Sequence, residues 1–353
     1  MMLTSDIALS KDGEYKTISE NYAKDIESLN KDFMHSWYKL TTADMGPASR
    51  CVGDDIPPPQ NFQNSLPENK SSEKPNFIPV RAEIVDILNR DNANGSAFVN
   101  LAYRCASTFR STDYKGGCNG ARIRFAPESE WKSNQGTTTA LDMLAPVKKM
   151  FPKVSMSDII VLAGQSAIEN AGGKVMDFCG GRVDAIDATG SDILAPRTYS
   201  PAVVSIRDDM QVKGLTAREG VALAGRPTAS VGFTNNFYKD LQVGNGNFSS
   251  EELALLEDEF GDIVSEYAED VEIFMNEFNM AWTKMMIADR FNGPFENVCT
   301  GVSDPTTGPS DIGSGDTGPD DKNGENTSSD AYKPLQVFTL FTAAAAAAGL
   351  LFI

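Results

Sequence analysis

Between residues 249 and 282, apolar side chains recur at a spacing that places them on one face of a helical segment. Steps of three or four residues follow the turn of an α-helix, whereas a strand requires strict alternation. Ser249-x-x-Glu252 has the form of a capping box and predicts where this segment begins. The stripe contains Leu253, Leu256, Phe260, Val264, Tyr267, Val271, Phe274, Phe278 and Trp282.

Two other stretches carry the signals of a helix start. Thr216-x-x-Glu219 predicts a shorter helix that runs to about Ala224. Ser155-x-x-Asp158 predicts another helix, which stops at Gly172-Gly173 because glycine accepts the conformation that ends a helix. Strand-like alternation is scarce, so the predicted fold class is mainly α with long connecting loops. Pro and Gly mark these loops at 53–78, 111–120 and 179–201.

Histidine and charge exclude several classes of function. His35 is the only histidine among 353 residues, so a His-rich zinc site and a haem pocket with distal and proximal histidines are both excluded within this chain. No metal site is predicted. The formal net charge is −18. A nucleic-acid partner needs a basic face, so none is expected.

The chain contains five cysteines and no C-x-x-C pair, which makes a zinc ribbon or a thioredoxin motif unexpected. An odd number leaves at least one thiol outside any internal bridge. Five cysteines are too few for a disulfide scaffold in a chain of this length, and their number does not decide the redox compartment.

The carboxyl-terminal tail, residues 335–353, contains no charged side chain and follows an acidic stretch, 301–334, that is predicted to be a disordered linker. As a helix rising about 1.5 Å per residue, the tail approaches the ~30 Å thickness of bilayer hydrocarbon. Small residues at Asn326-Thr-Ser, a polar spacer and an apolar end form the pattern of a glycolipid (GPI) anchor signal.

Asn326 is then the expected site of lipid attachment, and the protein is expected to be membrane-associated, with a GPI anchor at the cell surface. A retained membrane span and a soluble Ala-rich helix are the alternatives for the tail. The amino-terminal segment 1–16 lacks the pattern of a secretory signal.

Three polar features of the sequence are considered as candidate functional sites: a carboxylate pair, a histidine and a basic cluster. Asp184 and Asp187 form a carboxylate pair or, more simply, cap a loop and pair with an arginine. His35 is interpreted as a packed or surface residue. A basic cluster either binds an anion or forms buried ion pairs with the abundant carboxylates, and the ion pairs are favoured. This cluster contains Arg104, Arg110, Arg122 and Arg124.

Several motifs, in order along the chain, resemble catalase-peroxidases, two-domain haem enzymes of the class I peroxidase superfamily. The resemblance covers nearly all of residues 1–292. It implies a haem-peroxidase-like helical fold, in which residues 1–60 correspond to the end of the haem domain and 61–292 to the haem-free carboxyl-terminal domain. The motifs are Trp37–Pro47, Ala106–Arg110, Gly116–Arg124, Asp158–Gly164, Ala281–Lys284 and Asp289–Phe291.

Composition and the resemblance together predict five segments along the chain. The first is a carboxyl-terminal stub of a peroxidase haem domain. A linker, a peroxidase-like domain, the acidic linker and the hydrophobic tail follow. Their bounds are 1–52, 53–78, 79–300, 301–334 and 335–353.

The haem-pocket positions implied by the resemblance are degenerate. Asn100, Tyr103 and Arg104 take the places of the arginine, tryptophan and histidine that act on peroxide in the family, and Pro227 takes the place of the histidine that binds iron. Arginine stays protonated and is no general base, and proline has no side-chain donor atom. Asp6 matches the carboxylate that orients the iron-binding histidine, although that histidine is absent.

The resemblance therefore implies haem b in the family but no cofactor and no catalytic residue in this chain. A supporting, non-catalytic role in the setting of hydrogen peroxide detoxification and oxidative stress is expected, with an upstream haem domain or a homodimer as partner. The alternatives are an active haem peroxidase with an unusual ligand, namely Cys105, Tyr103 or His35, and a membrane-tethered binding module.

Overall fold

The protein was analysed as a computed structural model. It describes residues 3–299, apart from 47–49, 54, 59, 61–62, 64–65, 68–74, 92, 198, 228–231 and 292–296. Asn326, the acidic stretch 301–334, the tail 335–353 and much of the expected linker 53–78 therefore lie outside the described residues. Within the described part, no helix combines the length and the apolar character that crossing a bilayer requires.

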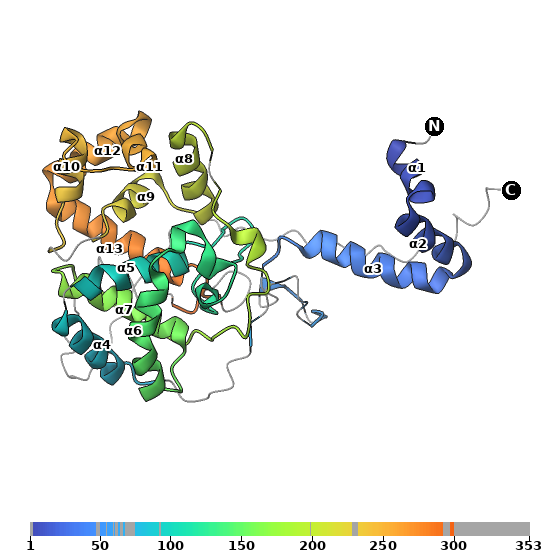
Figure 1. Cartoon of the computed structure of the whole chain (residues 1–353), viewed down its shortest axis with the longest axis horizontal. Helices are drawn as coiled ribbons and strands as arrows, with labels where there is room; N and C mark the ends of the chain where they lie inside the picture. Colours follow the sequence, from blue (N-terminus) through green and yellow to red (C-terminus); the bar gives the residue numbers. More distant parts are fainter. Residues whose placement is uncertain are drawn as a thin grey trace, which may run out of the picture. The chain divides into compact units, whose positions relative to one another are not determined.

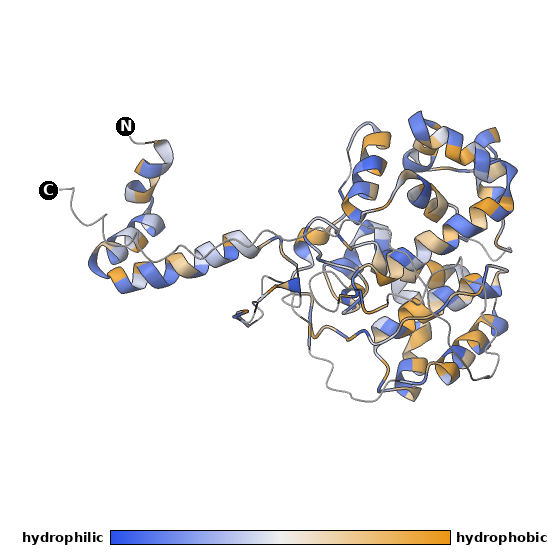
Figure 2. Cartoon of the chain, turned by 180° about the vertical axis from the view of Figure 1, so that it is seen from behind, coloured by the Kyte–Doolittle hydropathy of each residue, from blue (hydrophilic) through white to orange (hydrophobic). Residues whose placement is uncertain are grey.

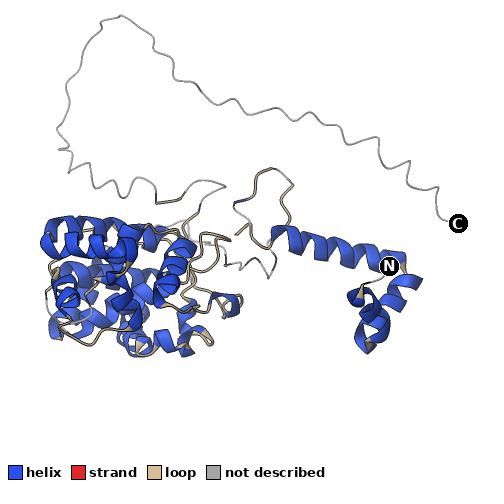
Figure 3. Cartoon of the chain, turned by 90° about the horizontal axis from the view of Figure 1, so that it is seen from above, coloured by secondary structure: helices blue, strands red, loops and turns tan. Residues whose placement is uncertain are grey.

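The described residues form a mainly α structure, as predicted, and Figure 1 shows the order of its helices. They are α1 (Thr4–Lys11), α2 (Gly13–Lys24), α3 (Ile26–Thr42), α4 (Ile78–Arg90), α5 (Ala93–Ala106), α6 (Thr137–Met150), α7 (Met156–Asn170), α8 (Ala202–Lys213), α9 (Ala217–Ala224), α10 (Asn236–Val243), α11 (Ser250–Leu253), α12 (Asp258–Glu269) and α13 (Val271–Ile287). Long loops and short 3-10 turns connect them, and only isolated β-bridges occur in the described part (Figure 3).

Helix α7 is the centre of the first half of the core. Every residue from Met156 to Ile168 is buried, as expected for a helix that neighbours surround on all sides. Helices α4, α5 and α6 pack against it. Gly164 permits the approach of α5, because a Cβ there would lie 2.4 Å from the Cβ of Ala102. Polar and apolar residues alternate along the surrounding helices, which are amphipathic (Figure 2).

The second half of the core consists of α9, α10, α12 and α13, which pack around aromatic rings. Tyr238 contacts Tyr267 and Phe274 with ring centroids 5.4 and 5.0 Å apart. The predicted cap at Thr216 is confirmed, because its side chain accepts a hydrogen bond from the amide of Glu219, whose carboxylate binds the amide of Thr216 in return.

The apolar stripe at 249–282 is divided among α11, a 3-10 turn, α12 and α13. Glu257 and Asp270 adopt extended backbone conformations and interrupt it. The side chain of Asp270 accepts hydrogen bonds from the amides of Glu272 and Ile273 and so caps the start of α13. The spacing of apolar residues does not reveal this cap. Leu253 and Leu256 are exposed, whereas most of the stripe from Phe260 onward is buried.

A buried ion pair joins α7 to the loop at 179–184. The side chain of Asp158 accepts hydrogen bonds from the amides of Gly181 and Arg182, at 2.8 and 3.2 Å, and from the Nη1 of Arg182 at 3.0 Å. Arg182 also donates to the carbonyl oxygens of Cys179 and Met286. One ion pair therefore holds the start of α7, this loop and the end of α13 together.

The carboxylates of Asp184 and Asp187 do not act as a pair. Asp184 accepts from the amides of Met156 and Ser157, which begin α7, and lies 3.3 Å from the Nζ of Lys148. Asp187 accepts from the amide of Thr189 within its own turn. The predicted capping role is confirmed, but the ion pair of Asp184 is with a lysine and not with an arginine.

Two disulfides join Cys105 to Cys118 and Cys179 to Cys299, and Cys51 is a free thiol, as the odd number of cysteines requires. No pattern in the sequence predicted these pairings. The first disulfide lies next to Arg104 at the end of α5, and the second ties the 179–184 loop to the segment that follows α13.

Candidate functional site

A cavity of about 470 Å³ lies where the end of α5 faces α8, α9 and α11. Tyr103 and Arg104 reach it from α5, and Met210 from α8. Leu223 and Arg226 reach it from the end of α9. Helix α8 packs against both α9 and α11, so the walls come from helices that already contact one another. The volume lies in the range typical of small-molecule sites.

The position of Arg226 depends on how α9 ends. Tyr238 is buried, and its hydroxyl donates to the carbonyl oxygen of Val221 at 2.8 Å. A Cβ on Gly225 would lie 2.4 Å from this hydroxyl, so only glycine fits after α9. The chain then continues into Arg226, whose Nη1 donates to the carbonyl oxygen of Leu223 at 3.1 Å. Arg226 is thereby held at the edge of the cavity.

Two guanidinium groups and a phenol ring meet in this cavity. The guanidinium carbon of Arg226 lies 3.9 Å from the ring centroid of Tyr103, and that of Arg104 lies 5.7 Å from the same centroid. Burial, followed by the charge of Arg226, lowers the pKa of Arg104. The Nε atoms of Arg104 and Arg226 are buried and have no hydrogen-bond partner among the described residues.

The carboxylates around the cavity are engaged by other groups. Asp209 forms an ion pair with Lys213 one turn later on α8. Glu252 accepts from the amide of Ser249 at 2.8 Å as part of a capping box, and Glu251 accepts from the hydroxyl of Ser250. Neither Arg104 nor Arg226 forms an ion pair within the described part of the chain.

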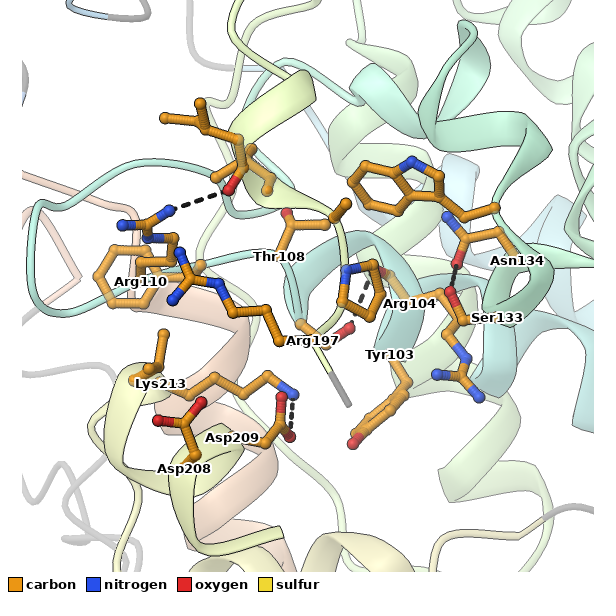
Figure 4. Close-up of a pocket in the computed structure, with 18 of the residues that line it drawn as sticks. Tyr103, Arg104, Thr108, Arg110, Ser133, Asn134, Arg197, Asp208, Asp209 and Lys213 are labelled. Carbon is orange, nitrogen blue, oxygen red and sulfur yellow. Dashed lines mark hydrogen bonds and ion pairs between the residues drawn. The ribbon is translucent and has the colours of Figure 1, made fainter. Parts of the chain in front are cut away.

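A smaller cavity of about 290 Å³ shares Tyr103 and Arg104 with the first. Figure 4 shows these residues on α5, together with Asp209 and Lys213 joined to each other on α8. Ser133 contributes to the opposite wall of the pocket. The two cavities therefore meet at the end of α5.

The structure brings only some of the predicted pocket residues together. Tyr103 and Arg104 line both cavities, whereas Asn100, one turn earlier on α5, lines neither. Pro227 is half-buried and is also absent from both linings. Its neighbour Arg226 lies in the larger cavity instead. Asp6 accepts from the amide of Leu3 at 2.7 Å and caps α1.

The basic cluster does not behave as one unit. Arg110 forms the expected ion pair with Asp113 at 3.0 Å. Arg124 donates to carbonyl oxygens instead, including that of Ala185 at 2.9 Å. Arg122 is buried near Glu128. Arg104 and Arg110 both line the smaller cavity, but only Arg104 of the two also lines the larger one.

The unusual haem ligands considered from the sequence gain no support. Cys105 forms a disulfide with Cys118, so it cannot offer a thiolate, and this alternative was wrong. His35 is exposed on α3. The ring of Tyr103 is covered by Arg226. Within the described residues, no group of His, Cys, Asp and Glu side chains could hold a metal ion.

The residues lining the cavity do not fit a haem group. The lining contains no imidazole or thiolate for the iron, and three arginines, Arg104, Arg197 and Arg226, carry like charge into the space. Iron in haem can also be held by a thioether or a phenolate. However, the side chain of Met210 packs against Gly220, and the ring of Tyr103 is covered by Arg226. Sequence reasoning identified Arg104 but missed Arg226, for which the only signal was its position directly before Pro227.

Comparison with known proteins agrees with this fold. A family model described as "Peroxidase" matches residues 80–232, which contain most of α4 and all the helices from α5 to α9. The catalase-peroxidase of Rhodopirellula baltica is 32% identical over 83% of this chain and 43% of its own length. Those of Geobacillus thermodenitrificans and Escherichia coli are both 31% identical over 83% of this chain, and over 48% and 41% of their own lengths.

The chain thus spans less than half the length of these relatives. The matched part contains both helices that carry the facing arginines of the cavity, α5 and the end of α9. The family match, the similarity to several catalase-peroxidases and the mainly α fold agree with one another. The chain belongs to the peroxidase family, as a catalase-peroxidase-like member of the haem peroxidase superfamily.

Proposed function

We propose that this chain is a haem-free, non-catalytic relative of catalase-peroxidases that supports a separate haem-bearing peroxidase domain. The observation that carries the proposal is the pair of guanidinium groups, Arg104 and Arg226, in the cavity between α5 and the end of α9. Peroxide cleavage needs a base to accept a proton, and arginine remains protonated. Arg104 therefore cannot replace that base, and the carboxylates at the cavity are held by Lys213, by the cap of α11 and by Ser250.

A haem titration tests the proposal directly. We expect the purified full chain, mixed with haem, to show no sharp Soret band at one haem per chain, and to degrade peroxide no faster than free haem. The physical reason is that no histidine or cysteine lines the cavity, while Met210 packs against Gly220 and the ring of Tyr103 is covered by Arg226. The Escherichia coli catalase-peroxidase is the positive control. Stoichiometric haem with a ligand-shifted Soret band and peroxide turnover would contradict the proposal.

The proposed partner follows from the first three helices. Helices α1, α2 and α3 contain no buried residue among those described. Apolar side chains on α3 are exposed, among them Phe33, Met34, Trp37 and Leu40, the last with 73% of its surface accessible. Such a surface is typical of an interface that a partner covers. We infer that the partner is the rest of a peroxidase haem domain, because residues 1–52 resemble the end of such a domain.

Co-expression tests this partner. The full chain is produced with the amino-terminal fragment of the Rhodopirellula baltica relative that precedes the region of similarity. We expect the two to copurify in equal amounts, with haem on the fragment. Because burial of α3 drives the association, the double substitution Phe33→Glu and Trp37→Glu should abolish it.

The matched control is Val243→Glu on α10, whose side chain is 77% exposed and lies on another helix. This control should copurify like the unchanged chain. A homodimer formed by the chain alone, and lost in the α3 variant, would make a second copy the occupant of this surface. Equal copurification of all three proteins would exclude α3 from the interface.

A further inference from the structure

We propose that the cavity between α5 and the end of α9 binds a small carboxylate that carries an apolar body. The inference rests on the proposed function in one respect, because it requires that haem does not occupy this space. It assigns a ligand to the two facing arginines, which neither the fold nor the family match explains.

The first argument is the state of the cations. The Nε atoms of Arg104 and Arg226 are buried and have no hydrogen-bond partner in the described part of the chain. Buried donors are nearly always satisfied, and an unsatisfied charged donor is costly. Two guanidinium groups on one phenol ring also repel each other. A bound anion would satisfy both donors and remove the repulsion.

The second argument is that no carboxylate forms an ion pair with Arg104 or Arg226 within the described part of the chain, although the charge of Asp209 partly offsets the lowering of the pKa of Arg104. The three carboxylates at the cavity are held by Lys213, by the cap of α11 and by Ser250. The space between the arginines is therefore left to a ligand. A carboxylate suits a guanidinium group because two parallel N–H···O bonds form between them.

The third argument concerns the rest of the ligand. Ile206, Met210, Leu215, Leu223 and Leu255 line the same cavity. A fully hydrated ion such as phosphate has no apolar surface to bury against these side chains. We therefore expect phosphate to bind less tightly than a ligand with an apolar part. A carboxylate with an apolar chain or ring can bind the arginines through its charge and pack its apolar part against these side chains.

Calorimetry with four probes tests the assignment. Octanoate has both features, acetate has only the charge, octanol has only the chain, and inorganic phosphate is a hydrated anion. We expect one octanoate per chain to bind at least about tenfold more tightly than any other probe. Equal binding of octanol would overturn the role of the arginines, and tighter binding of phosphate would overturn the apolar body.

Substitutions of the arginines distinguish a role in binding from a role in stability. Arg104→Gln and Arg226→Gln should each weaken octanoate binding at least about tenfold. Without ligand, Arg104→Gln should raise the melting temperature by about 2–3 °C, because it removes the repulsion between the guanidinium groups. Arg90→Gln on the exposed face of α4 is the control; it should leave octanoate affinity unchanged and should not raise the melting temperature, because Arg90 takes part in an exposed ion pair.

Unchanged octanoate affinity in both cavity variants would overturn the proposal. If Arg104→Gln fails to fold, Arg226→Gln alone decides the question. Failure here is distinguishable from failure of the proposed function. Stoichiometric haem binding would contradict both the proposed function and the carboxylate site. If the chain binds neither haem nor octanoate, only the carboxylate site is contradicted.

Discussion

Replacement of Asp158 by asparagine is expected to lower the free energy of unfolding by about 3–5 kcal/mol. The side chains of Asp158 and Arg182 are 1% and 0% exposed, and their charged atoms lie 3.0 Å apart. The substitution keeps the size of the side chain but removes its charge. The guanidinium of Arg182 is then buried without a counter-charge, which is far more costly than the loss of an exposed pair.

Denaturation in urea, followed by circular dichroism, measures this effect. The control is Asp86→Asn, which removes the charge from an ion pair with Arg90 at 3.1 Å. Both side chains of that pair are about two-thirds exposed, so we expect a loss of at most about 1 kcal/mol. Equal losses for the two variants would show that the buried pair does not hold the loop at 179–184 against α7.

This ion pair lies among the motifs that carry the resemblance to catalase-peroxidases. Asp158 begins one of the motifs that carry the resemblance. Asp289 belongs to a second motif. Its carboxylate accepts a hydrogen bond from the amide of Asn119, which belongs to a third motif, at 2.6 Å. Arg290 donates to the carbonyl oxygen of Gly180, next to the loop that Asp158 holds. Three of the shared motifs therefore meet at a structural junction, whereas a fourth, Ala106–Arg110, contributes to the smaller cavity at the end of α5.

The sequence was sufficient for the fold class and for local features. Caps at Ser155 and Thr216 satisfy the free amides of a helix start within a few residues, so their pattern is visible in the sequence. The break at Asp270 was missed because apolar periodicity continues across it. Arg226 was missed for a different reason. Its approach to Arg104 depends on the packing of α9 against distant helices, which no local pattern encodes.

The disulfides illustrate the same limit, because five cysteines allow many pairings and spacing does not select one. A test of these pairings can begin with the purified chain. Under denaturing, non-reducing conditions, the chain should react with one equivalent of a thiol reagent, at Cys51.

Removal of the disulfide between Cys179 and Cys299 is expected to be among the most destabilising changes in the protein. Its cysteines are 120 residues apart in sequence, and closing a loop of that length restricts the unfolded chain by about 4–5 kcal/mol. The disulfide between Cys105 and Cys118 has a separation of 13 residues, for which the same relation gives about 3 kcal/mol.

The double variant Cys179→Ser and Cys299→Ser should therefore unfold at a lower urea concentration than Cys105→Ser with Cys118→Ser. Cys51→Ser controls for the loss of a thiol and should behave like the unchanged chain, because Cys51 forms no bridge. A reducing agent should lower the stability of the unchanged chain but leave a variant without either disulfide unaffected. The opposite order of the two double variants would mean that local packing around α5, and not loop length, determines what each bridge contributes.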